Sequence, residues 1–161
     1  MATQGNIDLN EGIPSIADAF VVIIKTEWNS NIINKLQEGV EKILQQNTVQ
    51  YAVYTVPGAV EITFAVKAYT TGNLRKADAF ITLGTVIKGD TPHFDFVCQS
   101  VTNGITNLNT DINVPVIFGI LTVNTEEQAW ERVDGVHGHK GEEAAAAAIK
   151  MIHLNRSFGN V

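Results

Sequence analysis

The sequence predicts an α/β fold, a three-layer sandwich in which helices cover both faces of a four-stranded parallel sheet. Four short runs of apolar and β-branched residues alternate with longer runs in which apolar residues recur every three or four positions. No repeat or linker divides the 161 residues, and no run approaches the roughly 20 apolar residues that span a membrane. Such alternation favours parallel strands joined by right-handed crossovers.

The first strand and helix follow a polar segment. Residues 1–16 show no periodicity, so we expect a loose arm followed by a single domain over residues 17–161. From Ala19, six consecutive apolar residues predict a strand buried on both faces. Asn29 or Ser30 is placed to cap the next helix. The core-facing stripe of that helix consists of Ile32, Ile33, Leu36, Val40, Ile43 and Leu44.

Two further strand–helix units follow. Residues 51–56 form a strand that ends at Pro57-Gly58, and a second helix continues to residue 71, before Gly72. The third strand lies within residues 77–87. The apolar stripe of the helix after it consists of Phe94, Val97, Val101, Ile105 and Leu108.

The rest of the chain predicts a fourth strand and two helices. Residues 114–123 form the strand, and Thr125 followed by acidic residues is typical of a helix start. Residues 135–141 interrupt the helical pattern, and an alanine-rich helix covers residues 142–154. We predict the strand order 2-1-3-4, a flavodoxin-like arrangement in which ligands bind at the carboxyl ends of the strands.

Composition excludes several classes of function. A net charge of −6, from 11 Lys+Arg against 17 Asp+Glu, gives no basic stripe for nucleic acid. The only cysteine, Cys98, excludes an intrachain disulfide, and the N-terminus resembles no export signal, so we expect a cytoplasmic protein. Because Cys98 adjoins a helix stripe and lacks a base, it is interpreted as a packing residue.

Motifs for metals and nucleotide cofactors are also missing. His137 and His139 are followed by no cysteine or acidic ligand at a matching spacing, so we predict no metal site. Neither a Walker loop nor a dinucleotide glycine fingerprint occurs, so we predict no cofactor. Asn155-Arg-Ser157 matches a glycosylation acceptor, and because we expect no export, we interpret the match as chance.

The turn after the third strand has the features of an anion site beside a proton carrier. Gly89 allows close approach to the main chain, Thr91 adds a hydroxyl, and the helix start supplies unpaired N–H groups. His93 follows two residues after Thr91, and histidine is the residue type most often used as a proton carrier. This pairing indicates chemistry on a small phosphorylated molecule, although a surface histidine at a helix start is the plainer interpretation of His93 alone.

Other candidates lie at neighbouring strand ends. Trp28 is placed to stack on a flat ligand or to serve as a rim aromatic. Glu61 is placed to bind hydroxyls or to complement a helix dipole. Arg132 and Lys140 lie beside the glycine-rich interruption, and without a partner they are solvated charges.

Over residues 19–158 the chain resembles the lumazine synthase family. The resemblance rests on six separated segments in the family's order: Glu27-Trp28-Asn29, residues 56–61, 83–93 and 115–119, Glu131-Arg132, and Lys140-Gly141. It implies a transferase of riboflavin biosynthesis without a cofactor. The implied reaction condenses 5-amino-6-(D-ribitylamino)pyrimidine-2,4-dione with 3,4-dihydroxy-2-butanone 4-phosphate to 6,7-dimethyl-8-ribityllumazine, releasing phosphate and water.

The resemblance also implies roles for individual residues. His93 is the implied proton-transfer residue, and Trp28 is the implied platform for the pyrimidine. The other implied pyrimidine and ribityl contacts are Ala59, Val60, Glu61, Thr85, Val86, Ile87, Phe118 and Lys140. The implied phosphate contacts are Gly89, Asp90, Thr91 and Arg132. Because a carboxylate repels phosphate, we expect Asp90 to act through its N–H with its side chain turned away.

The resemblance implies a homo-oligomer with shared sites. Phe118, Arg132 and Lys140 match positions that reach the site from a neighbouring subunit of a pentamer. The compact loop at His137 is compatible with a 60-subunit shell, and riboflavin synthase is a candidate partner; nucleic acid and membranes are not. Two alternatives remain: a different phosphosugar-binding enzyme that uses the same turn, and a non-catalytic flavin-binding or shell-forming module.

Overall fold

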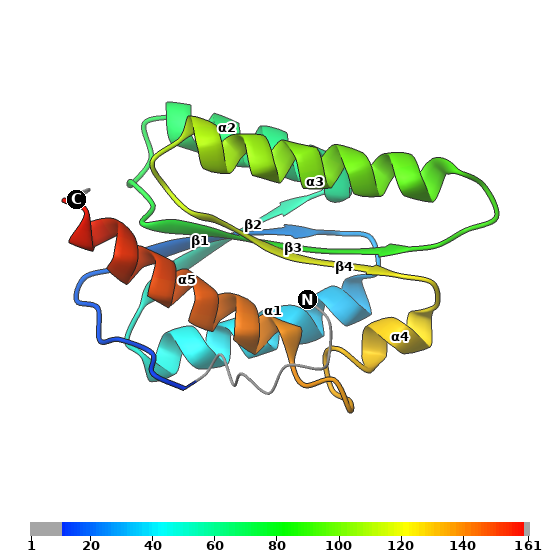
Figure 1. The fold of residues 1–161 in the computed structure, drawn as a ribbon, viewed down its shortest axis with the longest axis horizontal. Helices are drawn as coiled ribbons and strands as arrows, with labels where there is room; N and C mark the ends of the chain where they lie inside the picture. The colour runs from blue at the N-terminus through cyan, green and yellow to red at the C-terminus, as the bar shows by residue number, and fades with distance from the viewer. Residues whose placement is uncertain (1–10, 160–161) are drawn as a thin grey trace.

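A computed structural model describes residues 11–159 and has four strands in one parallel sheet (Figure 1). The strands are β1 (Phe20–Thr26), β2 (Gln50–Val56), β3 (Ala79–Ile87) and β4 (Val116–Val123). Their spatial order is β2-β1-β3-β4, and every neighbouring pair is parallel. The predicted strand order and fold class are therefore confirmed.

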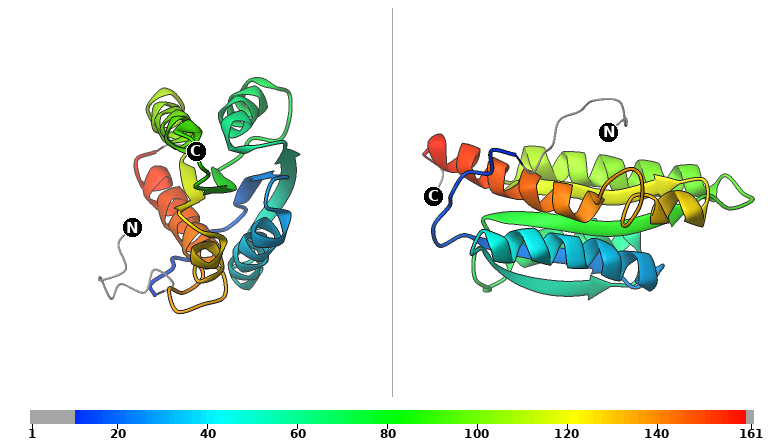
Figure 2. Two further views of the ribbon diagram at one scale, coloured as in Figure 1. Left: turned by 90° about the vertical axis from the view of Figure 1, so that its right-hand side faces the viewer. Right: turned by 90° about the horizontal axis from the view of Figure 1, so that it is seen from below.

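Helices cover both faces of this sheet (Figures 1 and 2). On one face lie α1 (Ser30–Gln46), α5 (Lys140–Ser157) and the short α4 (Glu126–Trp130). On the other face lie α2 (Ile62–Thr71) and α3 (His93–Asp111), and a 3-10 turn, η1 (Ala59–Glu61), leads into α2. The parallel strands place their carboxyl ends at the same edge of the sheet.

Two apolar cores lie on the two sides of the sheet. Alternate residues of β1 contribute to each, with Val21 and Ile23 in the core under α1 and α5, and Val22 and Ile24 in the core under α2 and α3. All six predicted stripe residues of α1 are buried. A continuously apolar strand and a one-sided apolar helix therefore fold as the sequence predicts.

The structure differs from the predicted elements mainly at their ends. Asn29 occupies the N-cap position of α1, but its side chain makes no capping hydrogen bond. The fourth strand begins at Val116 rather than at residue 114, and the last helix begins at Lys140 rather than at residue 142. These shifts are within the usual uncertainty of element boundaries.

The predicted N-terminal arm is described only in part. Residues 11–16 contain no helix or strand, and Ile16 is buried against the core. Residues 1–10 of the predicted arm lie outside the described residues. Within residues 11–159, no helix is both long and apolar enough to cross a bilayer.

Candidate active site

A cavity of about 490 Å³ lies at the carboxyl ends of β1, β2 and β3. Candidate residues from segments that are far apart in the sequence line this cavity. Its lining consists of Thr26, Trp28, Asn29, Pro57, Gly58, Ala59, Val60, Glu61, Thr85, Val86, Ile87, Gly89, Thr91, His93, Phe94 and Val97. Ten of the fourteen candidate site residues lie in this one lining.

The aromatic side of the cavity is Trp28, which follows β1. Its side chain is 77% exposed, so no protein group covers the ring. The main chain beneath it is fixed, because the N–H of Trp28 donates to Pro57 O (3.4 Å) and the N–H of Glu27 donates to Val56 O (2.9 Å). An exposed ring on an anchored main chain suits stacking on a flat ligand.

The inner wall of the cavity is the end of β3. Thr85 is only 5% exposed, and its Oγ1 has no hydrogen-bond partner among the described residues. Its carbonyl accepts a hydrogen bond of 2.9 Å from Asn29 Nδ2. A buried hydroxyl without a partner costs free energy unless a ligand or water satisfies it. This wall therefore offers a polar contact to a bound molecule.

A carboxylate stands at the turn between β2 and α2. The N–H of Glu61 donates to Gly58 O (3.3 Å), which closes the 3-10 turn. A Cβ at Gly58 would lie 3.1 Å from Glu61 Oε2, so the absence of a side chain leaves room for the carboxylate to fold over this turn. Glu61 is exposed and in the cavity lining, where its oxygens can accept hydrogen bonds from hydroxyls.

The predicted anion site lies at the start of α3. A Cβ built on Gly89 meets no protein atom within 4 Å, so the space beside this residue is open. The first main-chain hydrogen bond of α3 runs from Asp95 N to Pro92 O (3.0 Å), so the helix itself does not use the N–H groups just before Asp95. Gly89, Thr91 and His93 line the same cavity, whereas Asp90 is exposed and not in the lining.

Three candidate residues lie away from this cavity. Phe118, on β4, is 42% exposed and lines a second groove of about 620 Å³ between α3 and β4. Arg132 and Lys140 flank the connection between α4 and α5. Within one chain, none of the three lines the cavity of Trp28 and His93.

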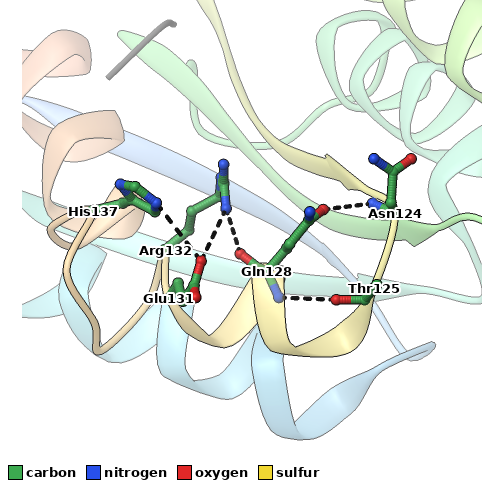
Figure 3. Close-up of polar contacts among 6 residues, drawn as sticks. All are labelled: Asn124, Thr125, Gln128, Glu131, Arg132 and His137. Carbon is green, nitrogen blue, oxygen red and sulfur yellow. Dashed lines mark hydrogen bonds and ion pairs between the residues drawn. The ribbon is translucent and has the colours of Figure 1, made fainter. Parts of the chain in front are cut away.

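Both cations are held by contacts within the chain. Arg132 Nη1 donates to Gln128 O (2.7 Å) and lies 4.0 Å from Glu131 Oε2, which is 3.6 Å from His137 Nε2 (Figure 3). Lys140 Nζ forms a 2.6 Å ion pair with Glu143. The sequence favours solvated charges only in the absence of a partner, and in this chain both side chains have partners.

Cys98 lines the second groove rather than the cavity. Burial, with a smaller contribution from the Asp95 carboxylate, raises the pKa of its thiol. A raised thiol pKa reduces the thiolate fraction, which does not suit a nucleophile. Within residues 11–159, no three His, Cys, Asp or Glu side chains lie close enough together to hold a metal ion.

Comparison with known proteins decides the family. The sequence model of the 6,7-dimethyl-8-ribityllumazine synthase family matches residues 18–156. The chain belongs to this family. Three lumazine synthases illustrate the similarity: those of Porphyromonas gingivalis (47% identity, covering 91% of each chain), Parabacteroides distasonis (43%, covering 89% of this chain and 90% of the relative) and Christiangramia forsetii (42%, 97% and 96%).

Membership in the lumazine synthase family confirms several predictions. The family, the enzyme class and the place in riboflavin biosynthesis are as predicted. Neither the non-catalytic module nor another phosphosugar enzyme receives support from these relatives. Small-molecule substrates and a homo-oligomeric assembly are general properties of lumazine synthases.

Sequence reasoning missed part of the lining of this lumazine synthase cavity. Phe94 and Val97 were predicted as core residues, yet both are half-buried and line the cavity. Asn29 was predicted only as a helix cap. The residue type is the only signal in the sequence, since asparagine tolerates a left-handed backbone. In the structure Asn29 has this backbone, with a φ of 57° at a strand end.

Proposed function

We propose that this chain condenses 5-amino-6-(D-ribitylamino)pyrimidine-2,4-dione with 3,4-dihydroxy-2-butanone 4-phosphate to 6,7-dimethyl-8-ribityllumazine. The observation that carries the proposal is the lining of one cavity by Trp28, Glu61 and His93. The aromatic ring suits the pyrimidine, the carboxylate suits the ribityl hydroxyls, and the imidazole suits proton transfer. Holding two substrates together supplies several kcal/mol of the barrier to a bimolecular reaction.

The phosphorylated substrate is assigned to the start of α3. The open space beside Gly89 and the hydroxyl of Thr91 lie where the helix dipole favours an anion. With this assignment, the leaving phosphate lies beside His93. One amine of the pyrimidine attacks the ketone and water leaves to form an imine, phosphate is eliminated, and the second amine closes the ring on the remaining carbonyl with loss of a second water. His93 carries protons between the reacting groups, and the helix terminus stabilises the departing phosphate. Asp90 contributes its main-chain N–H, because its exposed side chain is outside the cavity lining.

The pyrimidine is assigned to the wall formed by Thr85, Val86 and Ile87. The unpartnered hydroxyl of Thr85 offers a hydrogen bond there, while the two apolar residues exclude water from the ring edge. Ala59 and Val60 border the ribityl chain next to Glu61. These assignments account for every candidate residue in the cavity.

Phe118, Arg132 and Lys140 are assigned to the cavity of a neighbouring subunit in a pentamer. The supporting observation is that all three are partly accessible yet lie outside the cavity of their own chain. Arg132 would add a charge-assisted bond to the phosphate, and Phe118 would close the pocket over the pyrimidine. We further propose a cytoplasmic location, a 60-subunit shell assembled from pentamers, and riboflavin synthase as its partner.

Subunit complementation tests the shared site. Trp28→Ala and Arg132→Ala each remove one half of it, so each variant alone should have low activity. In mixed assemblies of the two, a pocket with native Trp28 can adjoin a neighbour with native Arg132. Equal random mixing should restore about one quarter of the sites. The measurement is lumazine fluorescence after the two variants are co-expressed.

The controls distinguish a shared site from a site within one chain. Each single variant co-expressed with the Trp28→Ala/Arg132→Ala double variant should recover nothing, because such a mixture lacks either native Trp28 or native Arg132 altogether. If co-expressed single variants stay as inactive as each alone, Arg132 acts within its own chain or not at all. Absence of lumazine formation by the wild-type assembly would remove the proposed reaction itself.

A further inference from the structure

A close contact between α1 and α5 involves a glycine inside a helix. Gly39 lies on the buried side of α1, where glycine lowers helix stability relative to alanine. A Cβ built on Gly39 would lie 2.1 Å from Cε1 and 2.3 Å from Nδ1 of His139. The imidazole of His139 therefore occupies a notch that only glycine leaves open.

The start of α5 is seated on α1 by a second glycine. A Cβ on Gly141 would lie 2.1 Å from the carbonyl oxygen of Leu36, so α5 touches the main chain of α1 at this point. His139 is the N-cap residue of α5, and its carbonyl accepts a hydrogen bond of 3.2 Å from Glu143 N. Side by side on one face of the sheet, α1 and α5 hold His139 between them (Figures 1 and 2).

The imidazole of His139 acts through its shape at this contact. Its Nδ1 is buried and has no hydrogen-bond partner among the described residues. The ring nevertheless fills the space that a Cβ on Gly39 would occupy. A ring that fills a fitted notch fixes the position of its own main chain.

His139 is coupled to the segment that carries both outlying cations. The N–H of Lys140, the next residue, donates to Arg132 O (2.8 Å). Within this loop, His137 N donates to Glu131 O (3.1 Å) and Gly138 N donates to Gly135 O (3.2 Å). These hydrogen bonds connect the main chain beside His139 to Arg132, so we expect a shift of His139 to move Arg132 as well.

We propose that His139 is a positioning residue for the lumazine synthase reaction. Seated against Gly39, it holds residues 131–140 where Arg132 and Lys140 reach the neighbouring pocket. The inference rests on the proposed assignment of Arg132 to the phosphate. It also makes the reaction depend on Gly39 in α1, a residue outside the cavity lining.

Substitutions that add bulk at Gly39 or remove it at His139 test this role. Gly39→Ala pushes a methyl into the imidazole, so the KM for the phosphorylated substrate should rise about tenfold, as expected when a binding group is misplaced. His139→Ala should raise the same KM, because the loop loses its anchor. The Gly39→Ala/His139→Ala double variant should have a lower KM than Gly39→Ala alone, since the methyl then occupies space vacated by the ring.

Gly104→Ala is the matched control. A Cβ there would lie 2.4 Å from Thr63 Cγ2, a similar overlap between α2 and α3 on the opposite face of the sheet. This variant should lose stability while the Lys140 amide exchanges as in wild type, because Gly104 lies on the face of the sheet opposite to α5. Equally faster exchange of the Lys140 amide in Gly104→Ala and Gly39→Ala would reduce the effect to general destabilisation and overturn the inference.

Hydrogen exchange of residues 131–141 separates this inference from the proposed function. Faster exchange of the Lys140 amide in Gly39→Ala and His139→Ala supports positioning by His139 without reference to activity. Unchanged exchange in both variants overturns it. Faster exchange with an unchanged KM for the phosphorylated substrate contradicts the assigned role of Arg132 and leaves the anchoring of the loop standing.

Discussion

The side chain of Asn29 joins the ends of two neighbouring strands: its Nδ2 donates a hydrogen bond of 2.9 Å to the main-chain carbonyl of Thr85. Asn29 follows β1, and Thr85 lies near the end of β3. The bond fixes the aromatic side of the cavity relative to its inner wall. Asn29 also has a φ of 57°, in the left-handed region that asparagine and glycine tolerate best.

Substitution of Asn29 should separate the hydrogen bond from the backbone requirement. Asn29→Gly removes the bond but keeps the left-handed backbone accessible, and we expect a loss of about 1 kcal/mol of stability. Asn29→Ala removes both and should cost about 1 kcal/mol more. Urea unfolding of each variant measures the difference. Equal stability of the two variants would show that backbone strain contributes nothing at this site.

Trp28 should report pyrimidine binding directly. Because Trp28 is 77% exposed, few intrachain contacts are lost in Trp28→Ala, so stability should change little. The Kd for the pyrimidine substrate should rise at least about tenfold through loss of stacking, whereas Trp28→Phe should retain most of the affinity. Calorimetric titration measures each Kd. An unchanged Kd in Trp28→Ala would remove this ring from the site.

His93→Ala should slow turnover without abolishing it. A general acid–base group contributes about 100-fold at the lower end of its usual range, and positioning of both substrates survives the substitution. The lumazine formation rate at saturating substrates measures this loss. A variant with the wild-type rate would exclude His93 from proton transfer.

The features that the sequence predicts are those that depend on the pattern of neighbouring residues. The stripe of α1 repeats at helical spacing and its residues are buried, and β1 is continuously apolar and lies inside the sheet. Trp28 was identified because it stands at a strand end, and His93 because it follows a turn suited to an anion. Parallel strands then bring such residues to one edge, as the cavity lining shows.

What the sequence did not reveal depends on contacts between distant segments. The bond from Asn29 to Thr85 and the seat of His139 on Gly39 join residues 56 and 100 positions apart. Phe94 has the spacing of a core residue, and only the position of the cavity makes it a lining residue. The proposed partners of Phe118 belong to a neighbouring subunit, and the spacing of residues along one chain does not identify them.

Cys98 should react slowly with thiol reagents in the folded protein. Burial raises the pKa of this thiol, so the thiolate fraction at pH 8 is lower than in the unfolded chain. A thiol pKa raised by folding also makes stability fall as pH rises through the ordinary thiol value of about 8.5. Alkylation with iodoacetamide, compared between folded and urea-unfolded protein, measures the protection. Equal rates at pH 8 would contradict it.

Two side chains cap the start of α4, each by accepting a hydrogen bond from a main-chain N–H group. Thr125 Oγ1 accepts a hydrogen bond from Gln128 N (3.3 Å), and Gln128 Oε1 accepts one from Asn124 N (2.8 Å) (Figure 3). Gln128 O also accepts from Arg132 Nη1 (2.7 Å). The cap therefore supports the main chain on which a proposed phosphate ligand rests.

Loss of this cap should reduce stability more than it reduces catalysis. Thr125→Ala removes the acceptor for Gln128 N, and we expect a loss of about 1 kcal/mol, with Thr125→Ser close to wild type. The Thr125 hydroxyl, after the hydrogen bond to the Glu127 main chain, also helps to lower the pKa of Glu127. A carboxyl pKa lowered by folding contributes stability above its unfolded value and loses it as pH falls through the folded value. Urea midpoints at pH 7 and pH 3 should therefore differ less in Thr125→Ala than in wild type, and an unaltered difference would exclude the hydroxyl from this linkage.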